Sequence, residues 1–152
     1  MIKRLGRLVD EITVVHSKLI LLIGAPQSGK SALLSTLAKD RHVIKLNLGV
    51  VLAKKLSVIA HKQRCLEAST ILRELFDRYT NDDLLLIDNI ELLFDRTLQL
   101  DPLNVLRRHA HGIRVVAVWP GELRDGRLIY ADIGHPEHQD YSLEGVLPFE
   151  IQ

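Results

Sequence analysis

The chain has a single cysteine, Cys65, among its 152 residues. One cysteine excludes an internal disulfide and a cysteine-rich metal site, which suits a reducing compartment. No apolar run reaches the length of a membrane span, and the first residues lack the ordered regions of a secretory signal. The sequence therefore predicts a soluble, cytoplasmic protein.

An excess of charge of one sign is also lacking. The chain carries 20 lysines and arginines against 19 aspartates and glutamates, a formal net charge of +1. Such a balance produces no large field that would attract nucleic acid or an acidic membrane, so net charge does not support direct DNA binding. The length fits one domain, residues 1–152, built around a single core.

What the sequence does contain is an apolar run, Leu19 to Ile23, that breaks into a glycine-rich loop. The loop matches the phosphate-binding pattern G-x-x-x-x-G-K-[ST] at every fixed position. Its residues are Gly24, Ala25, Pro26, Gln27, Ser28, Gly29, Lys30 and Ser31. The pattern predicts a strand, a loop whose backbone amides surround phosphates, and a helix that starts near Ser31. Lys30 would reach the β- and γ-phosphates, and the Ser31 hydroxyl would hold Mg²⁺.

A second apolar segment, Leu84 to Ile87, ends in Asp88 and follows the Walker B pattern. Asp88 is therefore predicted to contribute a carboxylate to the Mg²⁺ site. In P-loop ATPases with an additional strand between these two motifs, which the chain resembles, a glutamate that polarises water often follows the acid. Here the residue is Asn89, which cannot act as a base at neutral pH. Glu91 is the nearest carboxylate, and it either turns back toward the γ-phosphate or serves as the N-terminal acid of a helix.

Apolar spacing predicts the remaining elements. Helices are expected over 2–12, 31–41, 50–62, 66–79 and 102–110, and strands over 42–48, 113–119, 128–131 and 146–151, with Gly49 closing the second strand. Asp101 and Pro102 suit the N-cap and first position of a helix. The predicted fold class is α/β, a parallel sheet of about five strands flanked by helices.

The same motifs resemble those of AAA+ ATPases. The resemblance implies a three-layer P-loop NTPase with strand order 5-1-4-3-2, and no sequence remains for the usual C-terminal lid domain. Where those proteins have a polar sensor residue, this chain has Trp119, which puts the usual sensing mechanism in doubt. The resemblance also makes Arg124 and Arg127 candidate arginine fingers toward a neighbouring subunit. The sequence alone favours solvated arginines flanking an Asp125-Gly126 turn.

Three potential metal ligands, His135, Glu137 and His138, lie close together near the C-terminus. With no cysteine nearby and Pro136 among them, they do not favour a zinc site. Histidines in a polar loop are more typical of a contact surface.

Over nearly its whole length the chain resembles the BrxF family, the small P-loop ATPase-like subunits of bacterial BREX phage-exclusion systems. The resemblance is carried by 24–31, 85–91, 101–103, 116–121, 130–131 and 134–137. It implies an ATP-binding, ATP-hydrolysing subunit that uses Mg²⁺ and works with other phage-defence proteins, a DNA methyltransferase among them.

Several features of the function stay open at this level. The ATPase is expected to be slow alone or dependent on a partner, and a homo-oligomer remains open. Asn89 and Trp119 also fit a nucleotide-binding scaffold with little turnover. A small-molecule or nucleotide kinase is a second alternative, although the sequence contains no lid insertion. The absence of the base-reading N-K-x-D motif of GTPases mildly favours ATP over GTP.

Overall fold

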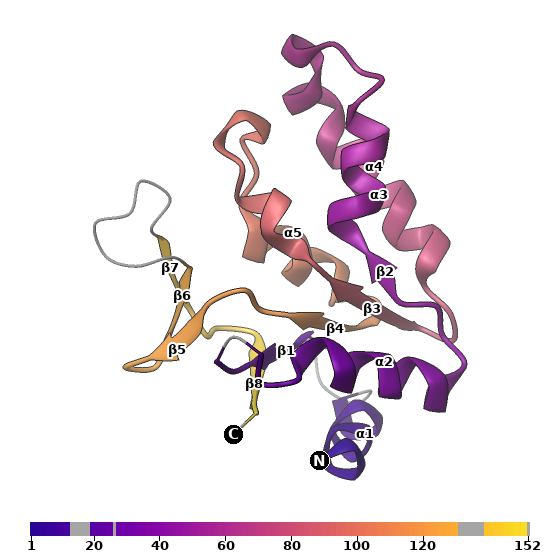
Figure 1. Cartoon of the computed structure of the whole chain (residues 1–152), viewed down its shortest axis with the longest axis vertical. Helices are drawn as coiled ribbons and strands as arrows, with labels where there is room; N and C mark the ends of the chain where they lie inside the picture. Colours follow the sequence, from indigo (N-terminus) through magenta and orange to yellow (C-terminus); the bar gives the residue numbers. More distant parts are fainter. Residues whose placement is uncertain (13–18, 26, 131–138, 152) are drawn as a thin grey trace.

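The computed structural model describes residues 1–12, 19–25, 27–130 and 139–151. Five parallel strands form the central sheet: β1 (Leu19–Ile23), β2 (Leu46–Asn47), β3 (Leu84–Asp88), β4 (Arg114–Val118) and β8 (Val146–Glu150). Their order is β2-β3-β4-β1-β8 (Figure 1). The order 5-1-4-3-2 implied by the resemblance matches this sheet when β8 is counted as the fifth strand, because the strand expected near Leu128 belongs to another sheet. Pro148 lies on this edge strand, where its missing N–H leaves no ladder bond broken.

Helices cover both faces of the sheet (Figure 1). They are α1 (Ile2–Glu11), α2 (Lys30–Arg41), α3 (Leu48–Leu56), α4 (Arg64–Tyr79) and α5 (Pro102–His109), with short 3₁₀ helices η2 (His61–Gln63), η3 (Ile90–Phe94) and η4 (Arg96–Leu98). Alternate β1 residues face opposite ways: Leu21 packs with the α3–α5 side, and Ile20 and Leu22 pack with α1 and α2. A strand buried on both faces is typical of parallel sheets and explains the unbroken apolar run of β1. No helix in the described ranges is long and apolar enough to cross a bilayer.

The second strand is much shorter than the sequence predicts. It covers only Leu46 and Asn47, and α3 begins at Leu48. The prediction of a strand over 42–48 closed by Gly49 is therefore wrong in its bounds. The Asn47 side chain accepts a hydrogen bond from the Val50 amide at 3.3 Å and so caps a helix that contains Gly49. The helix predicted over 50–62 likewise ends early, at Leu56.

A small antiparallel sheet of β5 (Glu122–Arg124), β6 (Arg127–Tyr130) and β7 (Gln139–Ser142) follows β4 and was not predicted apart from the strand near Leu128. Asp125 and Gly126 form its hairpin turn with φ of 52° and 74°, the signs that a tight hairpin turn requires. The predicted turn at these two residues is therefore confirmed.

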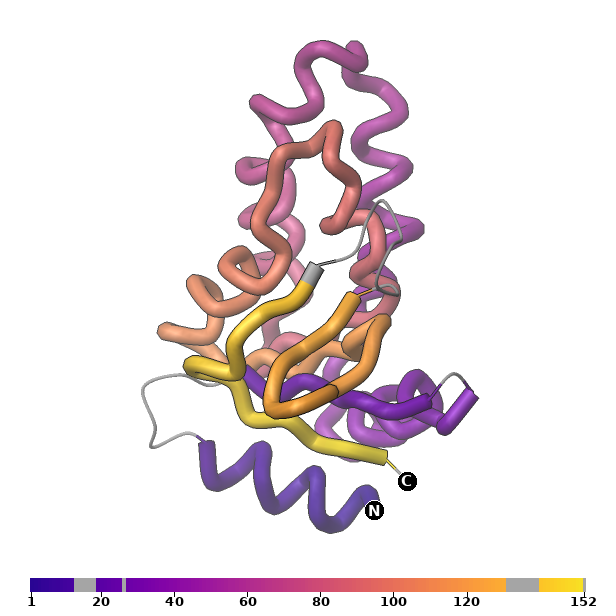
Figure 2. The backbone as a smooth tube through the Cα atoms, turned by 90° about the vertical axis from the view of Figure 1, so that its left-hand side faces the viewer, coloured from indigo at the N-terminus to yellow at the C-terminus, as the bar shows by residue number. Residues whose placement is uncertain are grey.

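Aromatic packing fixes this small sheet against the end of β4. Phe94 stacks on Tyr130 with ring centroids 3.8 Å apart, and the Trp119 indole Nε1 donates to the Ile129 carbonyl at 3.1 Å. A Cβ at Gly121 would stand 1.7 Å from that same carbonyl oxygen, so only glycine permits the approach. The hairpin consequently lies beside the carboxyl ends of the central strands (Figure 2).

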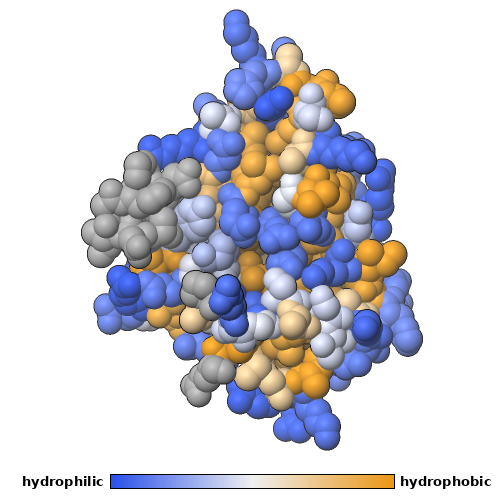
Figure 3. Space-filling model, in the orientation of Figure 1, coloured by the Kyte–Doolittle hydropathy of each residue, from blue (hydrophilic) through white to orange (hydrophobic). Residues whose placement is uncertain are grey.

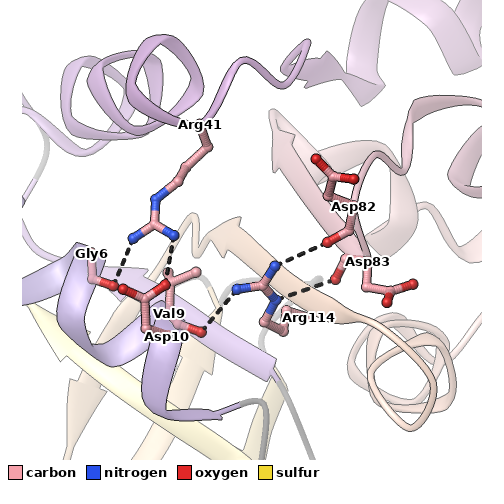
Figure 4. Close-up of polar contacts among 7 residues, drawn as sticks. All are labelled: Gly6, Val9, Asp10, Arg41, Asp82, Asp83 and Arg114. Atoms are coloured by element: carbon pink, nitrogen blue, oxygen red, sulfur yellow. Dashed lines mark hydrogen bonds and ion pairs between the residues drawn. The ribbon is translucent and has the colours of Figure 1, made fainter.

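The opposite end of the sheet is closed by two arginines (Figure 4). Arg41, the last residue of α2, donates to the Asp10 carboxylate at 2.6 Å and to the Gly6 carbonyl at 2.9 Å. Arg114, the first residue of β4, donates to the carbonyls of Val9 at 3.3 Å and Asp82 at 3.0 Å. These contacts attach α1 to the amino ends of the strands, away from the Gly24–Ser31 loop.

Candidate functional site

The strand order brings the predicted motifs to one edge of the sheet. β4 lies between β1 and β3, with Leu22 opposite Val118 and Ile87 opposite Ala117. Because the three strands are parallel, Gly24, Trp119 and Asp88 lie together at their carboxyl ends. Open α/β sheets bind ligands at the carboxyl ends of their strands.

The Gly24–Ser31 loop connects β1 to α2, with Pro26 outside the described residues. Its turn is closed by the Ser28 amide, which donates to the Ala25 carbonyl at 3.1 Å. Gly29 has a φ of 94°, a conformation that favours glycine. It is the N-cap of α2, and no side chain in the described part of the chain caps it. The first amides of α2 are therefore available to an anion, as is usual at a helix N-terminus.

Two further features of the loop suit a ligand. A Cβ at Gly24 would stand 2.5 Å from the Ser28 hydroxyl oxygen, so the backbone folds closely on itself there. The Ser28 Oγ is buried and has no hydrogen-bond partner among the described residues. An unsatisfied buried hydroxyl is uncommon in native structures and is often completed by a ligand or water. Ser31 is exposed at the second position of α2.

Lys30 lies at the centre of the site. Its Nζ donates to the Gly24 carbonyl at 3.0 Å and to the Trp119 carbonyl at 3.2 Å, and so links the loop to the end of β4. Partial burial lowers the pKa of Lys30, and the Glu91 and Asp88 carboxylates act in the opposite direction. The ammonium thus stands between backbone acceptors and two acidic groups.

Asp88 is the buried acid at the end of β3, with its side chain 6% exposed. Its Oδ1 accepts from the Asn89 amide at 2.9 Å, and its Oδ2 lies 3.3 Å from the Lys45 Nζ. Lys45 also donates to the Ser35 hydroxyl on α2 at 2.9 Å. A buried carboxylate beside a helix that carries serines supplies the hard oxygen ligands that Mg²⁺ prefers, so Asp88 and Ser31 fit that ion.

Sequence reasoning missed Lys45. The signal in the sequence was a lysine within residues 43–46, a segment that is otherwise apolar. A charged residue within a core strand needs a partner, and the acid at the end of the neighbouring strand is its natural candidate.

Asn89 turns the chain sharply after β3, with φ of 57° and ψ of 60°. Glu91 follows in the first turn of η3. Partial burial raises the pKa of Glu91; its own backbone hydrogen bond and Lys30 lower it, while Asp88 raises it. The chain therefore coils back at once, and Glu91 lies in the electrostatic reach of the two groups predicted to contact phosphate and metal.

A pocket of about 530 Å³ opens beside the loop. Gly24, Ala25 and Lys30 line one side, the β5–β6 hairpin lines another through Leu123 and Arg124, and the end of β8 completes it. Arg124 is ion-paired with Glu122.

The two predicted arginines are placed differently. Arg124 lines the same pocket as Lys30 of its own chain, whereas Arg127 pairs with Asp140 on β7 at 2.7 Å. His135, Glu137 and His138 lie outside the described residues. Lys30 thus links two groups: it lines the pocket with Arg124, and it lies within electrostatic reach of Asp88 and Glu91, which do not line that pocket. Arg127 is held in a separate ion pair.

Comparison with known proteins gives no match, neither to a model of a protein family nor to a curated sequence.

Proposed function

We propose that this chain is a P-loop NTPase domain that binds ATP with Mg²⁺ across the Gly24–Ser31 loop and hydrolyses it slowly. The observation that carries the proposal is the position of Lys30. Its ammonium joins the loop to the end of β4 and lies within electrostatic reach of the Asp88 carboxylate, at the edge where the loop and the Walker B acid meet.

In the proposed complex the amides at the start of α2 donate hydrogen bonds to the phosphate oxygens. Lys30 exchanges its two carbonyl partners for β- and γ-phosphate oxygens, and the Ser28 hydroxyl gains a partner. Ser31 and Asp88 would hold Mg²⁺, which neutralises charge that develops on the transferred phosphoryl group.

Glu91 is the proposed acceptor of the proton from the attacking water. Its raised pKa makes it a better base than an ordinary exposed glutamate. Asn89 cannot take this role, which is a reason to expect slow turnover. Arg124 lines the pocket from its own chain, and it would stabilise charge on the triphosphate once it leaves its ion pair with Glu122.

A scaffold that binds ATP with little turnover is the second candidate. It is favoured by Trp119, whose only polar side-chain atom is already bonded to Ile129 and so is not free to sense the γ-phosphate. Assembly with phage-defence proteins of the BREX type is proposed on the sequence resemblance alone.

Nucleotide binding and phosphate release by the purified chain test this proposal. ATP affinity is measured by calorimetry with and without Mg²⁺, and phosphate release is followed over a series of protein concentrations. Binding with measurable release supports the ATPase, and binding without release at any concentration leaves the scaffold. Failure to bind any nucleotide would overturn the proposal.

A further inference from the structure

Lys45 occupies a position that the proposed function leaves unexplained. Its side chain is 27% exposed and reaches two groups on different elements, the Ser35 hydroxyl of α2 and the Asp88 carboxylate of β3. Ser35 lies four residues after Ser31, so both serines lie on one face of the helix. The Lys45 ammonium therefore stands one helical turn beyond the serine proposed to hold Mg²⁺.

Both oxygens of Asp88 have partners within the chain. Oδ1 accepts from the Asn89 amide, and Oδ2 is paired with Lys45. A divalent cation that binds this carboxylate meets the Lys45 ammonium, which lies 3.3 Å from Oδ2. Like charges at such a separation repel each other, so the ammonium opposes binding of the cation.

We propose that Lys45 competes with the divalent cation for Asp88. In the nucleotide-free chain Lys45 neutralises the buried carboxylate, and binding of metal with nucleotide displaces the ammonium from Oδ2 and leaves it on Ser35. This inference rests on the proposed nucleotide site and goes beyond it, since it assigns control of metal affinity to a residue outside both motifs.

The arrangement has two opposite consequences. A buried carboxylate without a cation is costly, so Lys45 stabilises the chain in the absence of metal. The same charge weakens metal binding. A lysine that served only the fold would contribute the first effect and not the second, and this difference makes the proposal testable.

The test measures the affinity of Mn²⁺ by electron paramagnetic resonance in the presence of saturating AMP-PNP. Lys45→Met keeps the aliphatic stem and removes the charge, and it is expected to bind Mn²⁺ about tenfold more tightly than the wild type while melting at a lower temperature without ligand. Ser35→Ala removes the hydroxyl on which the displaced ammonium would rest, so it is expected to weaken Mn²⁺ binding, by less than Lys45→Met strengthens it.

Matched variants control for charge and fold. Lys45→Arg keeps the cation and should bind Mn²⁺ as the wild type does, and Lys39→Met removes an exposed charge of α2 without effect. Asp88→Asn should weaken Mn²⁺ binding at least tenfold. If Lys45→Met does not fold, the comparison of Ser35→Ala with the wild type decides the question.

The contrary outcomes are distinct. Mn²⁺ affinity in Lys45→Met equal to or weaker than in the wild type, with AMP-PNP still bound, would overturn the role of Lys45 and leave the nucleotide site intact. A wild-type chain that binds no AMP-PNP in EDTA or in Mn²⁺ would overturn both proposals.

Discussion

The two ends of the central sheet hold their polar groups through different cations. At the amino ends of the strands, Arg41 and Arg114 bind backbone carbonyls and the Asp10 carboxylate (Figure 4). At the carboxyl ends, Lys30 and Lys45 bind carbonyls, a hydroxyl and the Asp88 carboxylate. The arginine fork fixes several partners in one geometry, whereas a lysine is a point charge on a flexible stem that can change partners. The arginine contacts therefore suit a purely structural role, and under the proposed function the lysine contacts are the ones exchanged for a ligand.

Removal of Lys30 should have the largest effect. Lys30→Ala is expected to lower ATP affinity about a hundredfold, because it removes the one side-chain cation of the Gly24–Ser31 loop from the proposed phosphate site. Lys39→Ala, at the other end of the same helix, should bind ATP as the wild type does. Calorimetry measures both. Unchanged affinity in Lys30→Ala would place the nucleotide elsewhere.

Arg124 distinguishes a site completed within one chain from one completed between chains. Arg124→Ala should reduce phosphate release about tenfold, which is less than the loss of a complete arginine finger causes. Release by the wild type should stay proportional to protein concentration. Arg127→Ala, whose arginine pairs with Asp140, should change release much less. A rate that rises more steeply than concentration in the wild type would instead favour an arginine supplied by a neighbouring subunit.

The pH dependence of turnover tests Glu91. A proton acceptor must be ionised, and the pKa of this carboxyl is raised above its ordinary value of 4.5. Turnover should therefore fall as pH decreases through a value higher than 4.5. Glu91→Gln is expected to bind ATP normally and to turn it over about tenfold more slowly. Its turnover should no longer show this fall at acidic pH, the acidic limb of the pH profile. An acidic limb that persists in Glu91→Gln belongs to another group.

Substitutions at the amino ends of the strands should change the stability of the fold and leave ATP affinity unchanged. Arg114→Ala is expected to lower the free energy of unfolding by about 1 to 2 kcal/mol, because carbonyls of Val9 and Asp82 lose a donor. Its ATP affinity should equal that of the wild type. Urea denaturation and calorimetry measure the two quantities. A large loss of ATP affinity would mean that the ends of the sheet are coupled.

A third region differs from both ends of the sheet. Hydrophobic side chains gather toward the outer end of α3 and α4 (Figure 3), where Val58 is 85% and Leu66 is 73% exposed. Lys55 and Lys62 are exposed in the same segment. The described residues contain nothing that shows what would cover this surface.

The sequence predicted the parts of the fold that depend on local pattern. The unbroken apolar runs of β1 and β3 identified buried parallel strands, and the glycine-rich loop placed the start of α2 within one residue. The order of the strands came from resemblance and not from periodicity, since apolar spacing does not specify which strands are neighbours.

The errors arise where a side chain overrides the local pattern. Asn47 caps a helix inside a segment that alternates like a strand. The β5–β7 sheet escaped prediction, apart from the strand near Leu128, because β5 and β7 are short and polar. Its position also depends on the packing of Trp119, Phe94 and Tyr130. Lys45 was missed because its partner, Asp88, is 43 residues away in the sequence.

A crystal structure of the chain with AMP-PNP and Mg²⁺ tests the central contrast most directly. The account predicts the triphosphate across Gly24–Ser31, with Lys30 released from the Gly24 and Trp119 carbonyls onto phosphate oxygens while the Arg41 and Arg114 contacts stay unchanged. A nucleotide bound away from this loop, or a Lys30 that keeps both carbonyl partners beside a bound triphosphate, would contradict it.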